Sequence, residues 1–201
     1  MIPAILIGYA VGSLPIGYLL AQKRAGGIDL RTVGSGNVGA TNVYRAAGLP
    51  TALAVMCADM AKGAAAVWLA GGGSHAVAAG VAAVIGHIYP IWLRFHGGKG
   101  VAVAAGVFSV LAPFATMLAA GVFFATVWLS RIVSLGSVAA TLTLPSVAWL
   151  AGSSTPVLAA AIGTGALILF RHRANMRRIV RGTERRVALV PRSAGRREGG
   201  R

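Results

Sequence analysis

The sequence predicts an all-α integral membrane protein with seven transmembrane helices, two of them short. Of its 201 residues, 56% are hydrophobic and only 11% are charged, with a mean hydropathy of +0.74, whereas soluble domains have about 25% charged residues. A helix needs about 20 residues to cross the hydrocarbon core. Six apolar stretches follow one another, at residues 1–22, 51–71, 75–93, 101–129, 136–151 and 155–170.

The first stretch opens at Met1 without a preceding basic segment, and no clear small-residue cleavage site follows it. A secretory signal peptide would have both features. The pattern therefore predicts a retained membrane anchor.

The stretch 101–129 has 29 residues with Pro113 near its middle, so it crosses either once or twice. Basic loops of membrane proteins favour the cytoplasm. Two crossings would put every basic connection and the arginine-rich C-terminal segment on one face, and the uncharged connections near 72–75, 112–114 and 151–155 on the other. This count predicts seven spans, with the N-terminus outside and the C-terminus cytoplasmic.

The net charge of +15 is concentrated at the C-terminus, where residues 171–201 hold 11 of the 19 basic residues. A nucleic-acid-binding protein would not carry 170 membrane-like residues beside such a segment, so contact with anionic lipid is favoured. We expect one membrane-embedded domain over 1–190 and a basic, disordered tail over 191–201. No nucleic acid, cofactor or obligate protein partner is expected.

Three polar segments fall on the predicted cytoplasmic face, at residues 23–50, 94–100 and 171–184. Two patterns within them resemble nucleotide-binding motifs but do not meet the requirements of those motifs. Gly34, Gly36 and Gly39 form G-x-G-x-x-G, but no strand precedes them as a dinucleotide site requires. Lys99 is followed by Gly100 instead of Ser or Thr, so "GGKG" is not a P-loop.

The segment "GGKG" (97–100) still has features of an anion site. Glycines let successive N–H groups form a concave nest for phosphate oxygens, and the helix expected from Val101 would point its positive end at the anion. The alternative is a flexible turn with a cytoplasmic lysine. From spacing alone, both interpretations remain open, as does a turn-and-cap role for the Ser/Asn-rich part of 23–50.

The sequence lacks the residues that several other reaction classes require. The sequence has no G-x-S-x-G elbow, no His-x4-Asp dyad and no metal-ligand spacing. Asp59 and Lys62 lie three residues apart and are expected to neutralise each other inside the membrane, as a structural brace or as support for a site. His87 is expected to be a packed polar residue.

Several motifs resemble the acyl-phosphate-dependent glycerol-3-phosphate acyltransferases, the PlsY family. They are "SGNVGATNVYRAAG" (35–48), "GGKGVAV" (97–103) and "RHRANMRRIVRGTE" (171–184), in family-like order and spacing. The sequence departs from the family pattern at Val103, where Thr is frequent, and at Met176, where Ile is more usual.

This resemblance implies an enzyme of the bacterial inner membrane with its active site on the cytoplasmic face. It implies transfer of a fatty acyl group from acyl phosphate to the 1-hydroxyl of glycerol 3-phosphate, giving lysophosphatidate and phosphate, the first step of phospholipid synthesis. The alternative from the residues alone is a transporter of phosphorylated metabolites, although the two halves show no obvious inverted repeat.

The resemblance also suggests site residues. Candidate catalytic residues are Ser35, Arg45, Lys99, His172 and Asn175. Candidate substrate- or phosphate-binding residues are Asn37, Thr41, Asn42, Gly97, Gly98, Gly100, Arg178, Gly182 and Glu184. Arg171 and Arg177 are expected to be surface anchors, and His96 a bystander at the interface. No metal ligand is expected.

Overall fold

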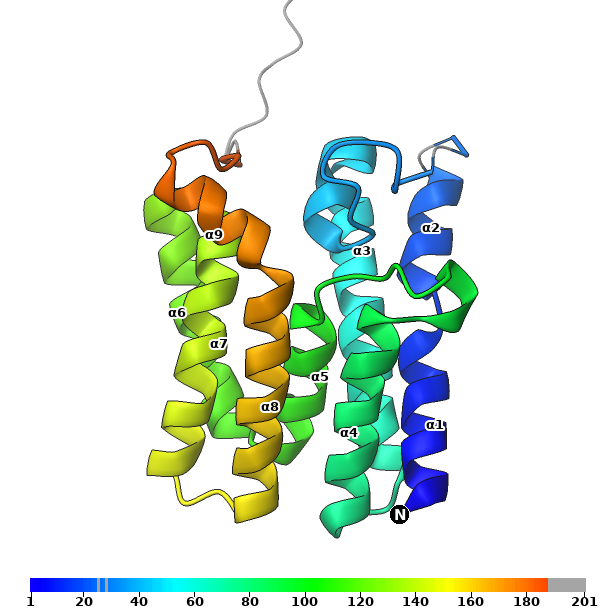
Figure 1. Ribbon diagram of the computed structural model, residues 1–201, viewed down its shortest axis with the longest axis vertical. Coiled ribbons are helices and arrows are strands. Elements are labelled where there is room, and N and C mark those ends of the chain that lie inside the picture. Colours follow the sequence, from blue (N-terminus) through cyan, green and yellow to red (C-terminus); the bar gives the residue numbers. More distant parts are fainter. Residues whose placement is uncertain (25, 28, 188–201) are drawn as a thin grey trace, which may run out of the picture.

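The computed structural model describes residues 1–24, 26–27 and 29–187 and places them in a bundle of helices, with no strand among these residues (Figure 1). The helices are α1 (Ile2–Ser13), α2 (Ile16–Arg24), α3 (Ala40–Leu69), α4 (Gly73–Ile88), the 3₁₀ helix η1 (Ile91–Leu93), α5 (Val101–Leu111), α6 (Pro113–Ser130), α7 (Val133–Leu150), α8 (Thr155–Arg171) and α9 (Arg173–Val180). The predicted tail, residues 191–201, lies outside the described part.

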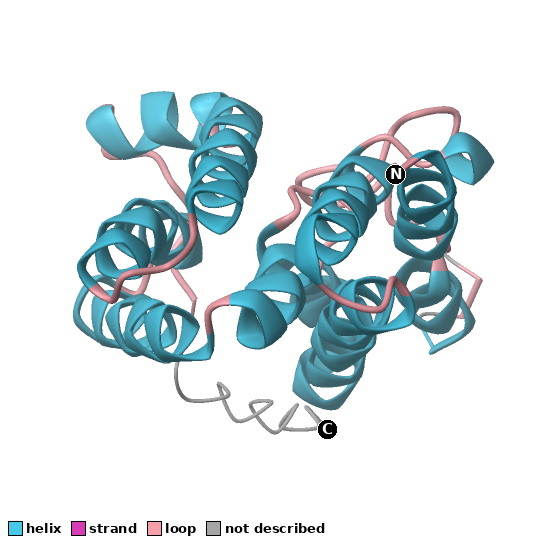
Figure 2. Cartoon of the chain, turned by 90° about the horizontal axis from the view of Figure 1, so that it is seen from below, coloured by secondary structure: helices cyan, strands magenta, loops and turns pink. Residues whose placement is uncertain are grey.

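The helices form two groups that α5 connects. Helices α1 to α4 make one group and α6 to α8 the other (Figure 1), and the view from below shows the two groups side by side (Figure 2). Helix α5 contacts α3 and α4 on one side and α6 and α8 on the other. It therefore joins the two halves of the bundle, together with a direct contact between α4 and α8.

The predicted break in the stretch 101–129 is confirmed. Helix α5 ends at Leu111 and α6 begins at Pro113, where proline is favoured because the first helical N–H has no partner within the helix. In Figure 1, α5 descends from the 94–100 segment and α6 returns toward the upper end.

Five helical segments in the described part are long and apolar enough to cross a membrane, and the bent pair α8–α9 would make a sixth. The bend between α8 and α9 is 59°. Helix α5 has only 11 residues, which agrees with the expectation of a short helix.

Two helix boundaries differ from the sequence prediction. Helix α3 begins at Ala40, so residues 40–47 of the presumed loop 23–50 are helical and join the span through a kink at Gly48 (φ 77°, ψ 174°). The first apolar stretch is broken between α1 and α2 at Leu14–Pro15, because proline supplies no N–H to continue the ladder. The Leu14 carbonyl oxygen instead accepts a hydrogen bond from Lys62 Nζ at 3.2 Å.

The predicted Asp59–Lys62 pair is confirmed within α3, with Lys62 Nζ 3.0 Å from Asp59 Oδ1 and both side chains buried. His87, on α4, lies beside the pair, with its Nδ1 3.5 Å from the same carboxylate oxygen. His87 is a buried, packed polar residue, as expected.

Helices α3 and α5 pack closely because glycines face the neighbouring backbone. A Cβ on Gly63 would collide with the Val103 carbonyl, and one on Gly106 would collide with the Met60 carbonyl. Small residues of this kind allow close helix contacts where lipid offers no hydrophobic driving force. This packing fixes α5, and with it the segment containing Lys99 that directly precedes the helix.

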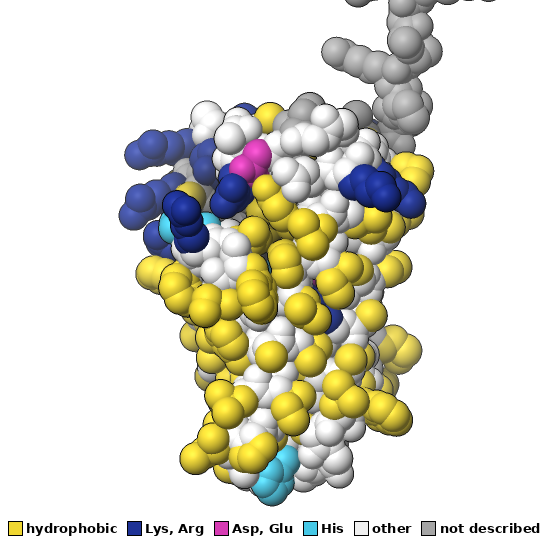
Figure 3. Space-filling model, turned by 90° about the vertical axis from the view of Figure 1, so that its right-hand side faces the viewer, with side chains coloured by type: hydrophobic (Ala, Val, Ile, Leu, Met, Phe, Trp, Pro, Cys, Tyr) yellow, Lys and Arg dark blue, Asp and Glu magenta, His cyan; other side chains and the backbone are white. Residues whose placement is uncertain are grey.

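Hydrophobic side chains cover most of the visible flank of the molecule, and most Lys and Arg side chains in this view gather toward its upper end (Figure 3). The N-terminus lies at the lower end, whereas α9 lies at the upper end (Figure 1). The polar segments between the helices are thus concentrated at one end of the bundle.

Candidate functional site

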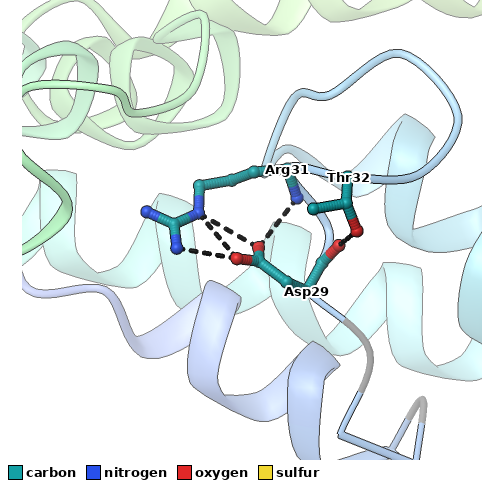
Figure 4. A network of polar contacts seen from close by, with 3 residues as sticks. All are labelled: Asp29, Arg31 and Thr32. Atoms are coloured by element: carbon teal, nitrogen blue, oxygen red, sulfur yellow. Dashed lines mark hydrogen bonds and ion pairs between the residues drawn. The ribbon is translucent and has the colours of Figure 1, made fainter.

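Residues 29–39 form a folded loop that is fastened near its start by Asp29 and Arg31 (Figure 4). The Arg31 guanidinium donates to both carboxylate oxygens of Asp29, at 2.7–3.0 Å, and lies 5.7 Å from the centre of the Tyr18 ring on α2. The hydrogen bonds from Arg31 hold the pKa of Asp29 well below its usual range. The loop is therefore anchored to α2 and not a loose linker.

Asn42 holds the same loop from the first turn of α3. Its Nδ2 donates to the carbonyl oxygens of Leu30 and Val33, and its Oδ1 accepts from the Ser35 amide, each at 3.0 Å. Its side chain is buried. Because all three contacts are with the loop backbone, Asn42 shapes the loop, and its Nδ2 has no N–H left for a substrate.

Some of the other candidate residues in this segment shape the loop, and others have side chains exposed to solvent. Asn37 Oδ1 accepts from the Gly39 amide at 2.8 Å, directly before α3. Thr41 is half-buried. Ser35 and Arg45 are exposed, so their side chains can reach a ligand at this end of the bundle.

The "GGKG" segment has a different backbone from the one predicted. The amides of Gly97 and Gly98 donate to the carbonyl oxygens of Ile88 and His87, at 3.1 and 3.2 Å. Those two N–H groups are thus occupied by the end of α4. Gly100, at φ 89°, forms the N-cap of α5. Within this segment, the groups left to contact a phosphate are therefore the Lys99 side chain and the backbone N–H groups from Lys99 onward.

Lys99 points at the third motif. Its Nζ donates to Asn175 Oδ1 at 2.5 Å, and Asn175 Nδ2 donates to Glu184 Oε1, also at 2.5 Å. Burial, with Arg178 among the neighbouring cations, lowers the pKa of Lys99 to about 8. The Lys99 ammonium therefore loses its proton as the pH rises through about 8.

Glu184 is the acceptor on which this network converges. Arg178 Nε donates to Oε2 at 2.6 Å and Ser134 Oγ donates to Oε1 at 2.7 Å. Burial raises the pKa of Glu184, but the hydrogen bonds from Ser134, Asn175 and Arg178 outweigh it and lower this pKa overall. The carboxylate is therefore ionised, and Gly182, at φ 68°, provides the turn that brings it back to α9.

Positive charge exceeds negative charge around the network. Lys99 interacts electrostatically with Arg45, Arg171 and Arg178, but with one carboxylate, that of Glu184. Clustered guanidinium and ammonium groups with backbone amides recognise phosphate. The arrangement therefore brings Arg45, from the first motif, together with residues of the second and third.

His172 occupies the bend between α8 and α9. Its side chain is buried, and its Nδ1 lies 2.8 Å from the Ile168 carbonyl oxygen. A carbonyl oxygen accepts only, so Nδ1 carries the proton and Nε2 keeps the lone pair of the neutral ring. His172 and Lys99 are close enough to interact electrostatically.

The expectation that Arg171 is a surface anchor is wrong. It is half-buried, its Nη2 donates to the carbonyl oxygens of Gly97 and Gly98 at 3.4 Å, and its guanidinium lies over the Tyr89 ring. Its Nε is buried without a hydrogen-bond partner among the described residues. Arg177, in contrast, is exposed, as is His96.

Ser134 was missed by sequence reasoning. It lies at the start of α7, three residues after Arg131, in a stretch that otherwise gives only a membrane-span pattern. The only sequence signal for a role of Ser134 at the site is a hydroxyl at the basic end of a predicted span, and this signal is weak. Within the described residues, no group of three His, Cys, Asp or Glu side chains could hold a metal ion.

Comparison with known proteins identifies the family of this site. The profile of the family "Glycerol-3-phosphate acyltransferase" matches residues 2–182. The chain belongs to this family. It is therefore an acyltransferase, and the resemblance of the three motifs is confirmed.

Relatives and solved structures cover nearly the whole chain. The glycerol-3-phosphate acyltransferases of Myxococcus xanthus (strain DK1622) and Synechococcus sp. (strain CC9902) are 46% and 45% identical, each over 90% of this chain and 97% and 92% of their own. A crystal structure of PlsY, an integral membrane glycerol 3-phosphate acyltransferase, in its glycerol 3-phosphate form, is 38% identical. It matches with a TM-score of 0.88 and covers 93% of this chain and 95% of its own. The lysophosphatidic acid form of PlsY matches with a TM-score of 0.86 and 36% identity.

Replacing Asn42 tests its assignment as a loop clasp. Asn42→Ala leaves two backbone carbonyls and one amide without their partner, and each buried unsatisfied group costs about 1–3 kcal/mol. We expect lower thermal stability in detergent and faster hydrogen exchange over residues 29–36. Asn37→Ala, which removes one hydrogen bond, is the matched control and should change both less. Equal stability of the Asn42 variant and the wild type would contradict the assignment.

Proposed function

We propose that this acyltransferase moves a fatty acyl group from acyl phosphate to the 1-hydroxyl of sn-glycerol 3-phosphate, giving lysophosphatidate and phosphate. The observation that carries the proposal is the cluster at Lys99, where four cationic side chains face a single carboxylate. Two phosphate groups, one from each substrate, would compensate this excess charge. The family membership and the PlsY structure with glycerol 3-phosphate support this assignment.

The reaction needs positioning and charge stabilisation more than a protein nucleophile. The 1-hydroxyl oxygen attacks the acyl carbonyl carbon, and the bond from that carbon to the phosphate oxygen breaks as phosphate leaves. Negative charge develops on the carbonyl oxygen and on the leaving phosphate, where fixed donors are most effective. Lys99 and Arg45 are assigned to phosphate, with Ser35 as a neutral donor. Arg171 adds positive charge beside Lys99, while its Nη2 donates to the Gly97 and Gly98 carbonyl oxygens.

The proton of the attacking hydroxyl needs an acceptor, for which two candidates remain. The donor's own phosphate is one and His172 Nε2 is the other. Glu184 is unsuitable, since its two oxygens already accept from Ser134, Asn175 and Arg178. We favour the phosphate, because it departs with the charge that the proton neutralises.

The finer membrane arrangement is also part of the proposal. The chain would cross the membrane seven times as one domain, with α1 and α2 forming one broken span and α5 the shortest. The basic end of the bundle would face the cytoplasm of a bacterial inner membrane, as the charge pattern favours. The transporter alternative loses its support, because no observation beyond clustered cations favours it.

A two-substrate assay tests the proposed function. Purified protein in detergent is given acyl phosphate and glycerol 3-phosphate, and both phosphate and lysophosphatidate are measured. Equal amounts of the two products, formed only when both substrates are present, are expected. Folded protein that forms neither product would refute the proposal, and phosphate release without glycerol 3-phosphate would indicate a hydrolase.

The rate should fall on the alkaline side as Lys99 loses its charge. Because the pKa of Lys99 is lowered to about 8, its ammonium is present below that pH and is lost above it. We expect kcat/KM for acyl phosphate to decline toward tenfold per pH unit above about pH 8, after subtraction of a blank without enzyme. Lys99→Arg stays charged and should flatten this decline, whatever its absolute rate. A wild-type profile that stays level to pH 10 would contradict the assignment.

His172→Asn separates the two proton acceptors. The Asn amide can replace the Nδ1 donor to the Ile168 carbonyl but offers no basic nitrogen. If the donor phosphate accepts the proton, kcat at saturating substrates should fall by less than about 10²-fold, the lower end for loss of a general base. A larger loss, with unchanged substrate affinity and thermal stability, would assign the role to His172.

A further inference from the structure

Three buried polar side chains below the site take no part in the proposed chemistry. Asp59, Lys62 and His87 are each less than 9% exposed. Lys62 Nζ bonds to Asp59 and to the Leu14 carbonyl at the break between α1 and α2. Charged groups inside a membrane protein are costly to bury and are functional candidates.

His87 connects this cluster to the "GGKG" segment. Its Nδ1 faces Asp59, while its Nε2 faces the backbone of Gly98, where an added Cβ would collide with it. Such a Cβ would also lie 2.8 Å from Cε1 and 3.1 Å from Cδ2 of the ring. The Gly98 amide donates to the His87 carbonyl oxygen at 3.2 Å. The segment therefore packs against the Nε2 edge of the imidazole ring and is tied to the backbone of His87.

The opposite side of this segment is also occupied. Arg171 donates to the Gly97 and Gly98 carbonyl oxygens, and the Gly97 amide donates to the Ile88 carbonyl. Each N–H and C=O group of the two glycines is thus engaged by the scaffold. The function of these glycines is close packing, and the next residue in the chain, Lys99, is the one presented to the site.

We infer that His87 is a positioning residue for acyl transfer: its imidazole, aligned by Asp59, is the surface that seats Gly98 and thereby holds Lys99 against Asn175. Lys99 Nζ lies 2.5 Å from Asn175 Oδ1, so a small displacement of the segment would break this contact. A misplacement of about 1 Å at a site can lower the rate by about 10²-fold.

The geometry excludes a direct catalytic role for His87. Gly98 covers Nε2, and Nδ1 faces a carboxylate that is already paired with Lys62. Substrate therefore has no open nitrogen of His87 to contact. Its effect on the reaction is transmitted through the position of Lys99.

A size-compensation experiment tests this inference, which rests on the proposed acyl transfer. Gly98→Ala should lower kcat/KM by about 10²-fold or more, because its Cβ needs the space of the His87 ring. His87→Ala removes that ring, so the double variant should recover at least about tenfold relative to Gly98→Ala alone. Gly121→Ala, which meets no atom within 4 Å, controls for an added methyl group and should match the wild type.

Gly97→Ala provides the matched negative control. Its Cβ would meet the His87 and Ile88 carbonyl oxygens and Pro90 Cδ, not the imidazole, so His87→Ala should not rescue it. Recovery of both glycine variants, or of neither, would overturn the inference. Wild-type protein without activity would instead refute the proposed function.

A second measurement does not depend on the stability of the His87 variant. If Gly98→Ala acts by displacing Lys99, adding it to Lys99→Met should cause little further loss. The double variant should then be within about threefold of Lys99→Met, at unchanged thermal stability. Losses that multiply would mean that Gly98 acts independently of Lys99 and would overturn the inference.

Discussion

The carboxylate of Glu184 is the interaction on which the site depends. It accepts from Ser134 on α7 and from Asn175 and Arg178 on α9. Through Asn175 it also fixes Lys99, which comes from the other side of the bundle. Removal of this one negative charge would leave Lys99, Arg45 and Arg178 to repel one another. The residue therefore offsets the repulsion among these cations, and it orients Arg178 directly and Lys99 through Asn175.

Carboxylates are scarce in this chain, and their scarcity constrains the chemistry. Each of the three in the described part has a cationic partner: Arg31 for Asp29, Lys62 for Asp59 and Arg178 for Glu184. Each pair also fastens a different polar segment, namely the 29–39 loop, the break between α1 and α2, and the turn after α9. A general base from this set would have to abandon a structural role, which favours a substrate group or a histidine as proton acceptor.

The sequence alone predicted those features that depend on periodicity and on charge along the chain. The break at Pro113 followed from charge placement, and the Asp59–Lys62 pair followed from helical spacing. It could not predict contacts that depend on how distant segments approach. Arg171 resembled one more arginine of a basic tail, yet it is drawn inward by the carbonyls of Gly97 and Gly98. Ser134 had no local pattern, because its partner lies 50 residues away.

The same limit explains why the glycines of the second motif were interpreted as a phosphate nest. A nest needs free N–H groups, and spacing cannot reveal whether another element uses them. In the structure the end of α4 occupies those of Gly97 and Gly98. Glycine is required there for a second reason, the absence of a side chain against His87. In the structure these two glycines therefore pack closely against the end of α4, directly before Lys99.

The short length of α5 gives this lysine a particular depth. Eleven residues rise about 16 Å at 1.5 Å per residue, roughly half of the 30 Å hydrocarbon core. In Figure 1 the upper end of α5 accordingly lies below those of α2 and α3. In the proposed arrangement Lys99 would lie below the level of the cytoplasmic loops, where burial already lowers its pKa. An acyl donor could then present its phosphate to Lys99 while its chain stays in the bilayer, and the water-soluble acceptor would enter from the exposed side of Ser35 and Arg45.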